Sequence, residues 1–197
     1  LEVRKPEPLF EQALEIPGRM SAAGEVLEPL DLELAAERLA ALESEGFEAV
    51  TICLLHAVAN PEHEEALGVL AEGFGFKEVV LSSRSSSAPR LVSRGDTALV
   101  DAYLGPVISS YVGSLAQAVP EAGLRLLTSA GALCSASAYS GKDSVLSGPA
   151  GGVVGAADVA RRAGSCRAIA FDMGGTSTDV SRWDGSFELE HETVKAG

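Results

Sequence analysis

The segment from Phe171 to Ser181 combines two carboxylates, a pair of glycines and four hydroxyl side chains. Asp172 and Asp179 flank the pair Gly174-Gly175, which can turn sharply because glycine has no Cβ to clash. Backbone amides in such a turn can point together at an anion. A carboxylate cannot bind phosphate directly, but it can hold a divalent cation that does, usually through water. The simplest chemistry for this combination is the binding of nucleotide phosphate with magnesium.

Two elements must position this segment. The apolar run 168–171 leads directly into it and predicts a buried strand that ends at Asp172. An ordinary hairpin turn, with Asp and Thr chosen for local hydrogen bonds, is the alternative interpretation.

A helix is predicted before that strand, with Pro149 in its first turn and its end near Arg162. It carries a stripe of four glycines on one face, at 148, 151, 152 and 155. Each glycine costs about 1 kcal/mol relative to alanine inside a helix, so the stripe needs a compensating reason. Close approach of a ligand and tight packing of the helix on a sheet are equally good reasons. On the first, Gly151 and Gly152 are candidate cofactor-binding residues.

The remaining chain alternates between helical and strand patterns. Asp31 and Gly46 are typical caps of a helix between them. Further elements are predicted at 49–55 (strand), 60–72 (helix), 79–81 (strand), 97–118 (helix) and 124–128 (strand). This βαβ order predicts an α/β fold with at least partly parallel strands. The first thirty residues are rich in Pro and Glu and predict extended chain with short strands.

Composition restricts the class of partner. The 197 residues are 46% hydrophobic and 22% charged, as in globular proteins, and carry a net charge of -13. This charge argues against binding of nucleic acid or of an anionic membrane through bulk electrostatics, and it means that polyphosphate needs a local site. The longest apolar run is too short to span a bilayer.

The cysteines and histidines give weaker signals. The three cysteines show no metal-ligand spacing and predict buried free thiols in a cytoplasmic protein. His56 follows a predicted strand and could line a cleft at its carboxyl end, although a structural role is the more common one. His63 is expected to be exposed in the first turn of a helix. Because the chain starts at Leu1 without Met, we expect a fragment of a longer protein.

With both glycine-rich segments placed, the chain resembles the hydantoinase/oxoprolinase family. Members carry segments similar to Ser147–Ala156 and, one strand later, to Phe171–Ser181. Further upstream, the chain matches at 54–56 with 60–64, at 75–83, and at 94–98 with 101–106, so that the resemblance covers nearly the whole chain. Details at Arg94-Gly95 and at 181–188 resemble the 5-oxoprolinase branch more than the carboxylase branch. One departure lies at 129–132, Ser-Ala-Gly-Ala, where the family usually has Asn or Asp before two glycines.

The resemblance implies an actin-like ATPase (ribonuclease H-like) fold, present in part. That fold has two similar halves, and each half opens with a phosphate-binding hairpin. By this comparison, residues 1–30 are a connecting segment, 31–165 are the rear of the first half, and 166–197 begin the second half with its hairpin. The hairpin of the first half is expected to precede this chain.

The resemblance also implies a function for the longer protein. It would be an ATP-dependent cyclic amide hydrolase that phosphorylates a lactam or imide oxygen and opens the ring with water. Implied cofactors are ATP and Mg2+, and implied partners are a hydantoinase B-type subunit or domain and further copies of the protein. The alternatives are a subunit of an ATP-dependent acetone or acetophenone carboxylase, and a protein that binds nucleotide as a switch or as an inactive fragment.

Roles follow from the match to the second hairpin. We expect the main-chain groups of Gly174, Gly175 and Thr176 at phosphate, with a hydroxyl contact from Thr178. Asp172 is the candidate catalytic residue, as a magnesium ligand or as the carboxylate that orients water. Asp179 is a second candidate metal ligand, and it could equally stabilise the hairpin.

Overall fold

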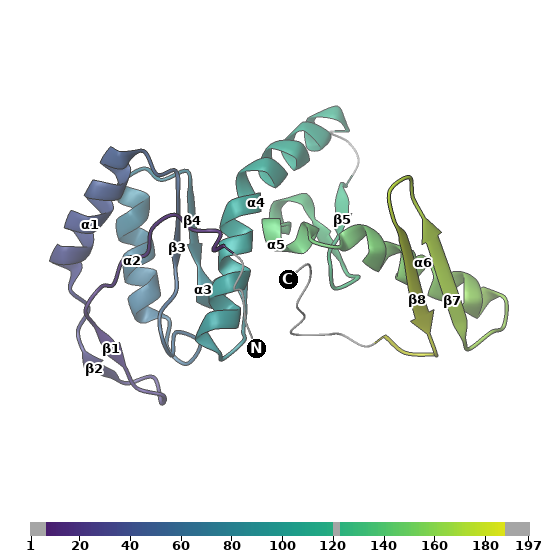
Figure 1. The fold of residues 1–197 in the computed structure, drawn as a ribbon, viewed down its shortest axis with the longest axis horizontal. Coiled ribbons are helices and arrows are strands. Elements are labelled where there is room, and N and C mark those ends of the chain that lie inside the picture. Colours follow the sequence, from purple (N-terminus) through teal and green to yellow (C-terminus); the bar gives the residue numbers. More distant parts are fainter. Residues whose placement is uncertain (1–6, 120–122, 188–197) are drawn as a thin grey trace. The chain divides into compact units, whose positions relative to one another are not determined.

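The computed structural model describes residues 7–119 and 123–187. They form two compact units, and the chain divides between them after Ser109. Figure 1 shows the order of the elements along the chain. The division falls inside the long helix α4 (Leu91–Ala118). The predicted assignment of 31–165 and 166–197 to two halves of a larger fold stays a prediction.

The N-terminal unit begins with two short antiparallel strands, β1 (Arg19–Met20) and β2 (Val26–Glu28), as expected for the first thirty residues. Helix α1 (Leu32–Glu45) follows. The Asp31 side chain accepts a hydrogen bond from the Leu34 amide at 3.0 Å. Gly46 ends the helix with a φ of 88°. Both predicted caps are confirmed.

A parallel βαβ unit forms the centre of the N-terminal unit. Strands β3 (Ala49–Ile52) and β4 (Glu78–Leu81) pair in parallel, with Ile52 opposite Leu81, and α2 (Glu62–Gly73) connects them. This confirms the predicted α/β class. Strand β3 ends at Ile52 rather than at Leu55, because the Leu54 amide leaves the ladder to bond the Glu64 side chain at 2.8 Å.

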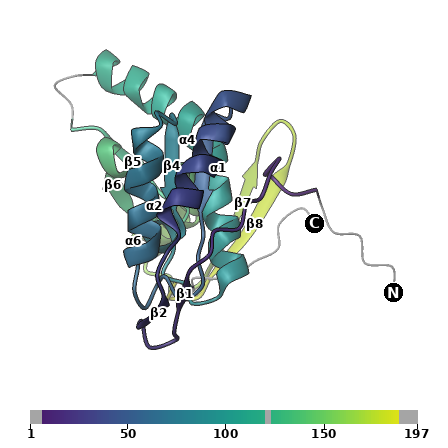
Figure 2. The ribbon, with the colours of Figure 1, turned by 90° about the vertical axis from the view of Figure 1, so that its left-hand side faces the viewer.

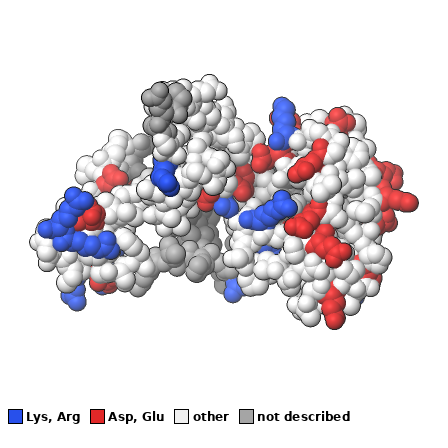
Figure 3. Space-filling view, turned by 180° about the vertical axis from the view of Figure 1, so that it is seen from behind, with Lys and Arg blue, Asp and Glu red and all other residues white. Residues whose placement is uncertain are grey.

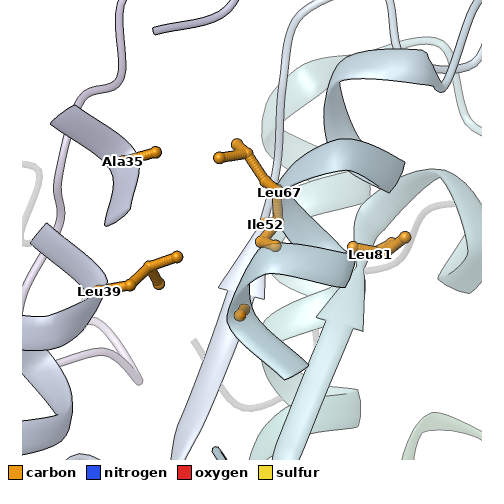
Figure 4. Packing of buried hydrophobic residues seen from close by; sticks show 6 residues of the cluster. Ala35, Leu39, Ile52, Leu67 and Leu81 are labelled. Carbon is orange, nitrogen blue, oxygen red and sulfur yellow. The ribbon is translucent and has the colours of Figure 1, made fainter. Parts of the chain in front are cut away.

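Helices cover both faces of this strand pair. Figures 1 and 2 show α1 and α2 side by side over one face. Apolar side chains from α1, α2 and both strands form the core there (Figure 4). They are Ala35, Leu39, Ile52, Leu67, Ala71 and Leu81. Because successive side chains of a strand alternate between faces, Val80 points the other way and packs on Ala98 and Ala102 of α4. Helix α4 begins six residues before the predicted start, after the short helix α3 (Ser82–Ser85).

The C-terminal unit contains two antiparallel hairpins and helix α6 (Ser147–Arg162), which matches its prediction. In the first hairpin, β5 (Arg125–Leu127) pairs with β6 (Leu133–Ser135), a strand that the sequence did not predict. The unusual segment 129–132 forms its turn, where Gly131 has a φ of 74°. A 3-10 turn (Ala136–Ala138) and the short helix α5 (Gly141–Ser144) lead to α6.

The second hairpin, β7 (Ala168–Met173) with β8 (Thr178–Trp183), packs on α6 through one face only. Trp183 and Ala168 lie on that face and contact Ala157 and Ala160. The opposite face is open in the described chain, where Ile169 is 75% and Phe171 67% exposed. The prediction of a buried strand ending at Asp172 is therefore wrong. Strand β7 runs one residue further, and its alternating side chains are covered on one side only.

Charge and thiols complete the description. Figure 3 shows acidic side chains over the visible face of the N-terminal unit, whereas Lys and Arg gather at one end of the C-terminal unit. All three cysteines are free, but Cys166 is exposed and the other two are half-buried, so the predicted burial is wrong. No helix among the described residues is long and apolar enough to cross a membrane.

Candidate functional site

The β7–β8 register places the two candidate metal ligands directly opposite each other. Asp172 pairs with Asp179, and Met173 pairs with Thr178 next to the turn. The turn consists of residues 174–177 and is closed by a hydrogen bond of 3.0 Å from the Gly174 amide to the Ser177 carbonyl. The hairpin therefore brings the two carboxylates together at the base of the glycine turn.

The tip of this hairpin presents hydrogen-bond donors to solvent. The Gly174 amide is used inside the turn, whereas the amides of Gly175 and Thr176 bond no other part of the described chain. The side chains of Thr176 and Thr178 are exposed. Of the three backbone amides predicted at phosphate, two are thus open to a ligand.

The two turn glycines are not required by the hairpin itself. Neither has a positive φ, so an ordinary side chain would fit the backbone conformation. A Cβ added to Gly175 would meet nothing within 4 Å, and one added to Gly174 would lie 3.7 Å from the Ser177 carbonyl oxygen. The sharp-turn argument therefore does not account for these residues, and the predicted approach of a ligand to the backbone stays a prediction.

The carboxylate pair has an electrostatic cost. Both side chains are exposed, and like charges directly opposite on a sheet destabilise the strand pair. Among the described residues, no group of three or more His, Cys, Asp or Glu side chains could hold a metal. Two carboxylates with the remaining positions open suit Mg2+, which keeps several waters and binds substrate phosphates alongside one or two carboxylates.

The four glycines of α6 have different surroundings. A Cβ on Gly151 would lie 2.9 Å from Leu127 Cδ2, so tight packing on β5 explains this glycine. One on Gly152 would lie 3.5 Å from Asp172 Oδ2, which places this glycine beside the hairpin carboxylate. Gly148 and Gly155 face open space within the described chain. Only Gly152 of the two candidates therefore adjoins the carboxylate pair.

A second polar cluster lies in the N-terminal unit, where sequence reasoning did not find it. Glu64, Ser82 and Arg94 are fully buried at the carboxyl ends of β3 and β4. Glu64 accepts hydrogen bonds from the Ser82 hydroxyl at 2.5 Å and from the Ser83 amide at 2.9 Å. Arg94 donates to the Ser82 hydroxyl at 2.9 Å and to the Leu54 carbonyl at 2.5 Å. The cluster fixes the loops that follow both strands.

The neighbouring thiol shares this environment. Burial raises the pKa of the Cys53 thiol above its ordinary value, against the opposing effects of the Ser82 hydrogen bond and the Arg94 charge. Its Sγ lies 3.6 Å from the Leu91 carbonyl oxygen. Cys53 is therefore a neutral packing residue at neutral pH.

The two histidines that the sequence singled out, His56 and His63, have different surroundings. His56 follows β3 with a left-handed φ of 63°, which is uncommon for a residue other than glycine. His63 is only 8% exposed, so the predicted exposure is wrong. Its Nδ1 lies 3.6 Å from the position of a Cβ on Gly18, a residue far away in sequence.

Comparison with known proteins gives matches over most of the chain. The family model described as hydantoinase/oxoprolinase matches residues 94–197, and its N-terminal region matches residues 1–74. 5-Oxoprolinase 1 of Arabidopsis thaliana is 38% identical over 100% of the chain, which spans 18% of that protein. The 5-oxoprolinase of Saccharomyces cerevisiae is 40% identical over 81% of the chain, which spans 13% of it.

A solved structure supports the fold. An ATP-dependent acetone carboxylase in its nucleotide-free form superposes with a TM-score of 0.79 and 25% identity, over 88% of this chain and 26% of that chain. The predicted fold class is thereby confirmed. The chain spans less than a fifth of the two 5-oxoprolinases that it matches.

Proposed function

Because the chain belongs to the hydantoinase/oxoprolinase family, we propose that it is part of an ATP-dependent hydrolase that opens a cyclic amide. The proposal concerns a protein of the length of the relatives. Identity of 38–40% to two 5-oxoprolinases favours a five-membered lactam as the substrate. The observation that carries the proposal is the cross-strand pair Asp172 and Asp179 at the base of an open glycine turn.

In the proposed reaction, the γ-phosphoryl group of ATP is transferred to the lactam oxygen and ADP leaves. Water then adds to the ring carbon, the carbon–nitrogen bond breaks, and a second water releases phosphate. Phosphoryl transfer needs mainly positioning and electrostatic stabilisation from the protein. The open amides of Gly175 and Thr176 supply both, because they are held in place by the closed turn.

Asp172 and Asp179 would hold Mg2+, which neutralises charge on the phosphates when bound. Relief of the repulsion between the carboxylates supports this assignment. Asp172 is the proposed catalytic carboxylate, and its Oδ2 lies 3.5 Å from the position of a Cβ on Gly152 of α6. Thr178, which precedes Asp179, would add a hydroxyl contact. We keep the predicted cofactor-binding role for Gly152 and assign Gly151 to packing against Leu127.

The partners remain part of the proposal. A cyclic amide is the proposed substrate, with a hydantoinase B-type subunit or domain and further copies of the protein as partners. The structural likeness to acetone carboxylase favours a second candidate function, a carboxylase subunit that phosphorylates an enol oxygen instead.

An ATPase assay distinguishes the two functions. The protein of full length is supplied with ATP, Mg2+ and either 5-oxoproline, hydantoin, or acetone with bicarbonate. We expect ADP release that depends on 5-oxoproline, with matching formation of the open-chain product. Release that depends on the ketone and bicarbonate would establish the carboxylase instead, and binding of ATP without any such dependence would refute both enzymes.

A further inference from the structure

The loop after β3 holds a histidine in a strained backbone conformation. His56 has a φ of 63°, which glycine adopts without cost and a residue with a Cβ adopts only under strain. Its carbonyl accepts hydrogen bonds from the amides of Ala59 at 2.8 Å and of Asn60 at 3.2 Å, so this conformation closes a turn. Glycine would close the same turn more easily. Residues that keep such strain occur preferentially at functional sites, so the side chain of His56 calls for a role.

The buried polar cluster of Glu64, Ser82 and Arg94 fixes the chain just before this turn. The Leu54 amide donates to the Glu64 carboxylate at 2.8 Å, and the Leu54 carbonyl accepts from the Arg94 guanidinium at 2.5 Å. Both charged side chains are fully buried. Buried charges are weak contributors to stability, and defining a unique geometry is a recognised use for them. The main chain that leads to His56 is therefore held from both sides.

The end of the turn is fixed as well. Asn60 Nδ2 donates to the Gly24 carbonyl at 2.9 Å, and Asn60 Oδ1 accepts from the Glu62 amide at 3.0 Å. These bonds tie the turn to the β1–β2 connection and to the start of α2. A catalytic side chain needs a support of this kind, because a small displacement of the reacting group is costly.

The position of His56 in the fold is one where ligands bind. It follows β3 at the carboxyl ends of the parallel strands β3 and β4, and open α/β sheets bind their ligands outside these ends. The side chain is half-buried, and no hydrogen bond joins the imidazole to another described residue. Its neighbours in the turn, Leu55 and Val58, are exposed apolar residues. An imidazole in such surroundings suits an organic substrate.

We propose that His56 is a catalytic residue of the ring-opening step, where it carries protons from water to the ring nitrogen. The inference rests on the proposed function. The hairpin residues of the other unit are assigned to phosphate and Mg2+, so that step still lacks a proton carrier. Imidazole is the side chain that most often moves protons in catalysis.

The proton balance of the step defines the role. Once the lactam oxygen carries phosphate and the amide proton has left, the ring carbon is doubly bonded to nitrogen. The oxygen of water bonds to this carbon, and the imidazole takes a proton from water and gives it to the nitrogen. The carbon–nitrogen bond then breaks with its electron pair on nitrogen, and the imidazole transfers the second proton of that water. An acyl phosphate and a free amine result.

His56→Gly in the protein of full length tests the role, because it removes the imidazole and the strain together. We expect a melting temperature equal to or above that of the wild type, and formation of the open-chain product from 5-oxoproline slower by about 10^2- to 10^4-fold. Added imidazole should restore part of this rate. A single-turnover burst of ADP should persist, since phosphoryl transfer precedes the step that needs His56.

Two further variants complete the test. His56→Asn keeps a residue that tolerates the left-handed conformation and should lose the same activity, so the test does not depend on the folding of His56→Gly. His63→Gln alters the buried histidine nearby, and any loss of rate in this control should not respond to imidazole.

The proposal is overturned by product formation within about threefold of the wild type in either His56 variant, by a loss in His56→Gly that imidazole does not restore, or by loss of the ADP burst. The wild type separates this failure from that of the proposed function. If the wild type opens no lactam, the proposed function fails. If the wild type and His56→Gly open it equally well, only the role of His56 fails.

Discussion

Asp172 and Asp179 face each other across the β7–β8 hairpin, one residue pair below the glycine turn. Two exposed carboxylates in this register repel each other, and the described chain provides no basic side chain that bonds to either. The hairpin is therefore less stable empty than it would be with a cation between the strands, which gives the pair a measurable signature.

The effect on stability of removing one of these two charges should depend on magnesium. Asp179→Asn is expected to raise the free energy of unfolding by about 0.2–1 kcal/mol without Mg2+, because the cross-strand repulsion is lost. With Mg2+ and ATP the wild type should gain more stability than the variant.

In the longer protein, Asp172→Asn should lower the ATPase rate about 10^2- to 10^3-fold. Asp184→Asn, beyond β8, is the control, and an equal loss there would contradict the assignment.

Gly175→Ala separates ligand binding from folding. The added Cβ meets nothing within 4 Å, and the backbone needs no positive φ, so stability should change by less than about 0.5 kcal/mol. Binding of ATP to the longer protein should nevertheless weaken, since the added methyl group enlarges the turn that phosphate is proposed to approach. Isothermal titration measures the affinity, and unchanged binding would remove the turn from the phosphate site.

The glycines of α6 should respond differently to alanine. Gly155→Ala is expected to stabilise the chain by about 1 kcal/mol, the usual helix preference, because its Cβ faces open space. Gly151→Ala should gain clearly less, since Leu127 must move away from a Cβ placed at 2.9 Å. Thermal and urea unfolding give both values. Equal gains would show that α6 does not pack tightly on β5.

Glu64 should be indispensable for the N-terminal unit. Glu64→Gln removes a buried carboxylate that accepts three hydrogen bonds, from the Leu54 amide, the Ser82 hydroxyl and the Ser83 amide, and should cost about 1.5–3 kcal/mol. Glu65→Gln, one residue further along the same helix, alters only an exposed ion pair with Arg84 and should change stability by less than about 1 kcal/mol. Comparable losses in the two variants would mean that the buried cluster is not coupled.

Glu78 should make stability depend on pH. Burial, helped by the nearby Asp101 charge, raises the pKa of the Glu78 carboxyl above its ordinary value of 4.5. The folded chain then holds this proton more tightly than the unfolded chain does. The stabilisation is complete below pH 4.5 and is lost as pH rises through the folded pKa.

Glu78→Gln should therefore be more stable than the wild type at pH 7, and the difference should vanish below pH 4.5. Urea unfolding at a series of pH values measures it. A difference that is constant with pH would show that Glu78 ionises normally.

The features that were predictable from sequence are local ones. Asp31 and Gly46 cap α1 through groups within a few residues, so their types suffice. The turn between Asp172 and Asp179 lies where the sequence placed it, although neither of its glycines has a positive φ, and the antiparallel register then fixes which side chains are opposite. The family resemblance extended this to the fold class.

The predictions that failed concern residues whose surroundings come from distant segments of the chain. Glu64 and Arg94 meet through Ser82, which is 18 residues from one and 12 from the other, and none of the three has a local signal for burial. His63 lies among glutamates and was expected in solvent, yet it is buried beside the distant Gly18. Phe171 was expected to be buried and is exposed, because an apolar strand sequence does not determine what covers each of its two faces.

The exposed apolar face of the β7–β8 hairpin should make association between molecules depend on ionic strength. The side chains on this face are apolar and exposed to water: Ile169, Phe171, Met173 and Val180. What opposes contact between molecules is the net charge of -13. The reach of that charge shrinks from about 10 Å at 0.1 M salt to about 3 Å at 1 M. We therefore expect the net negative charge to oppose association of the chain through this face, and to do so less at high salt.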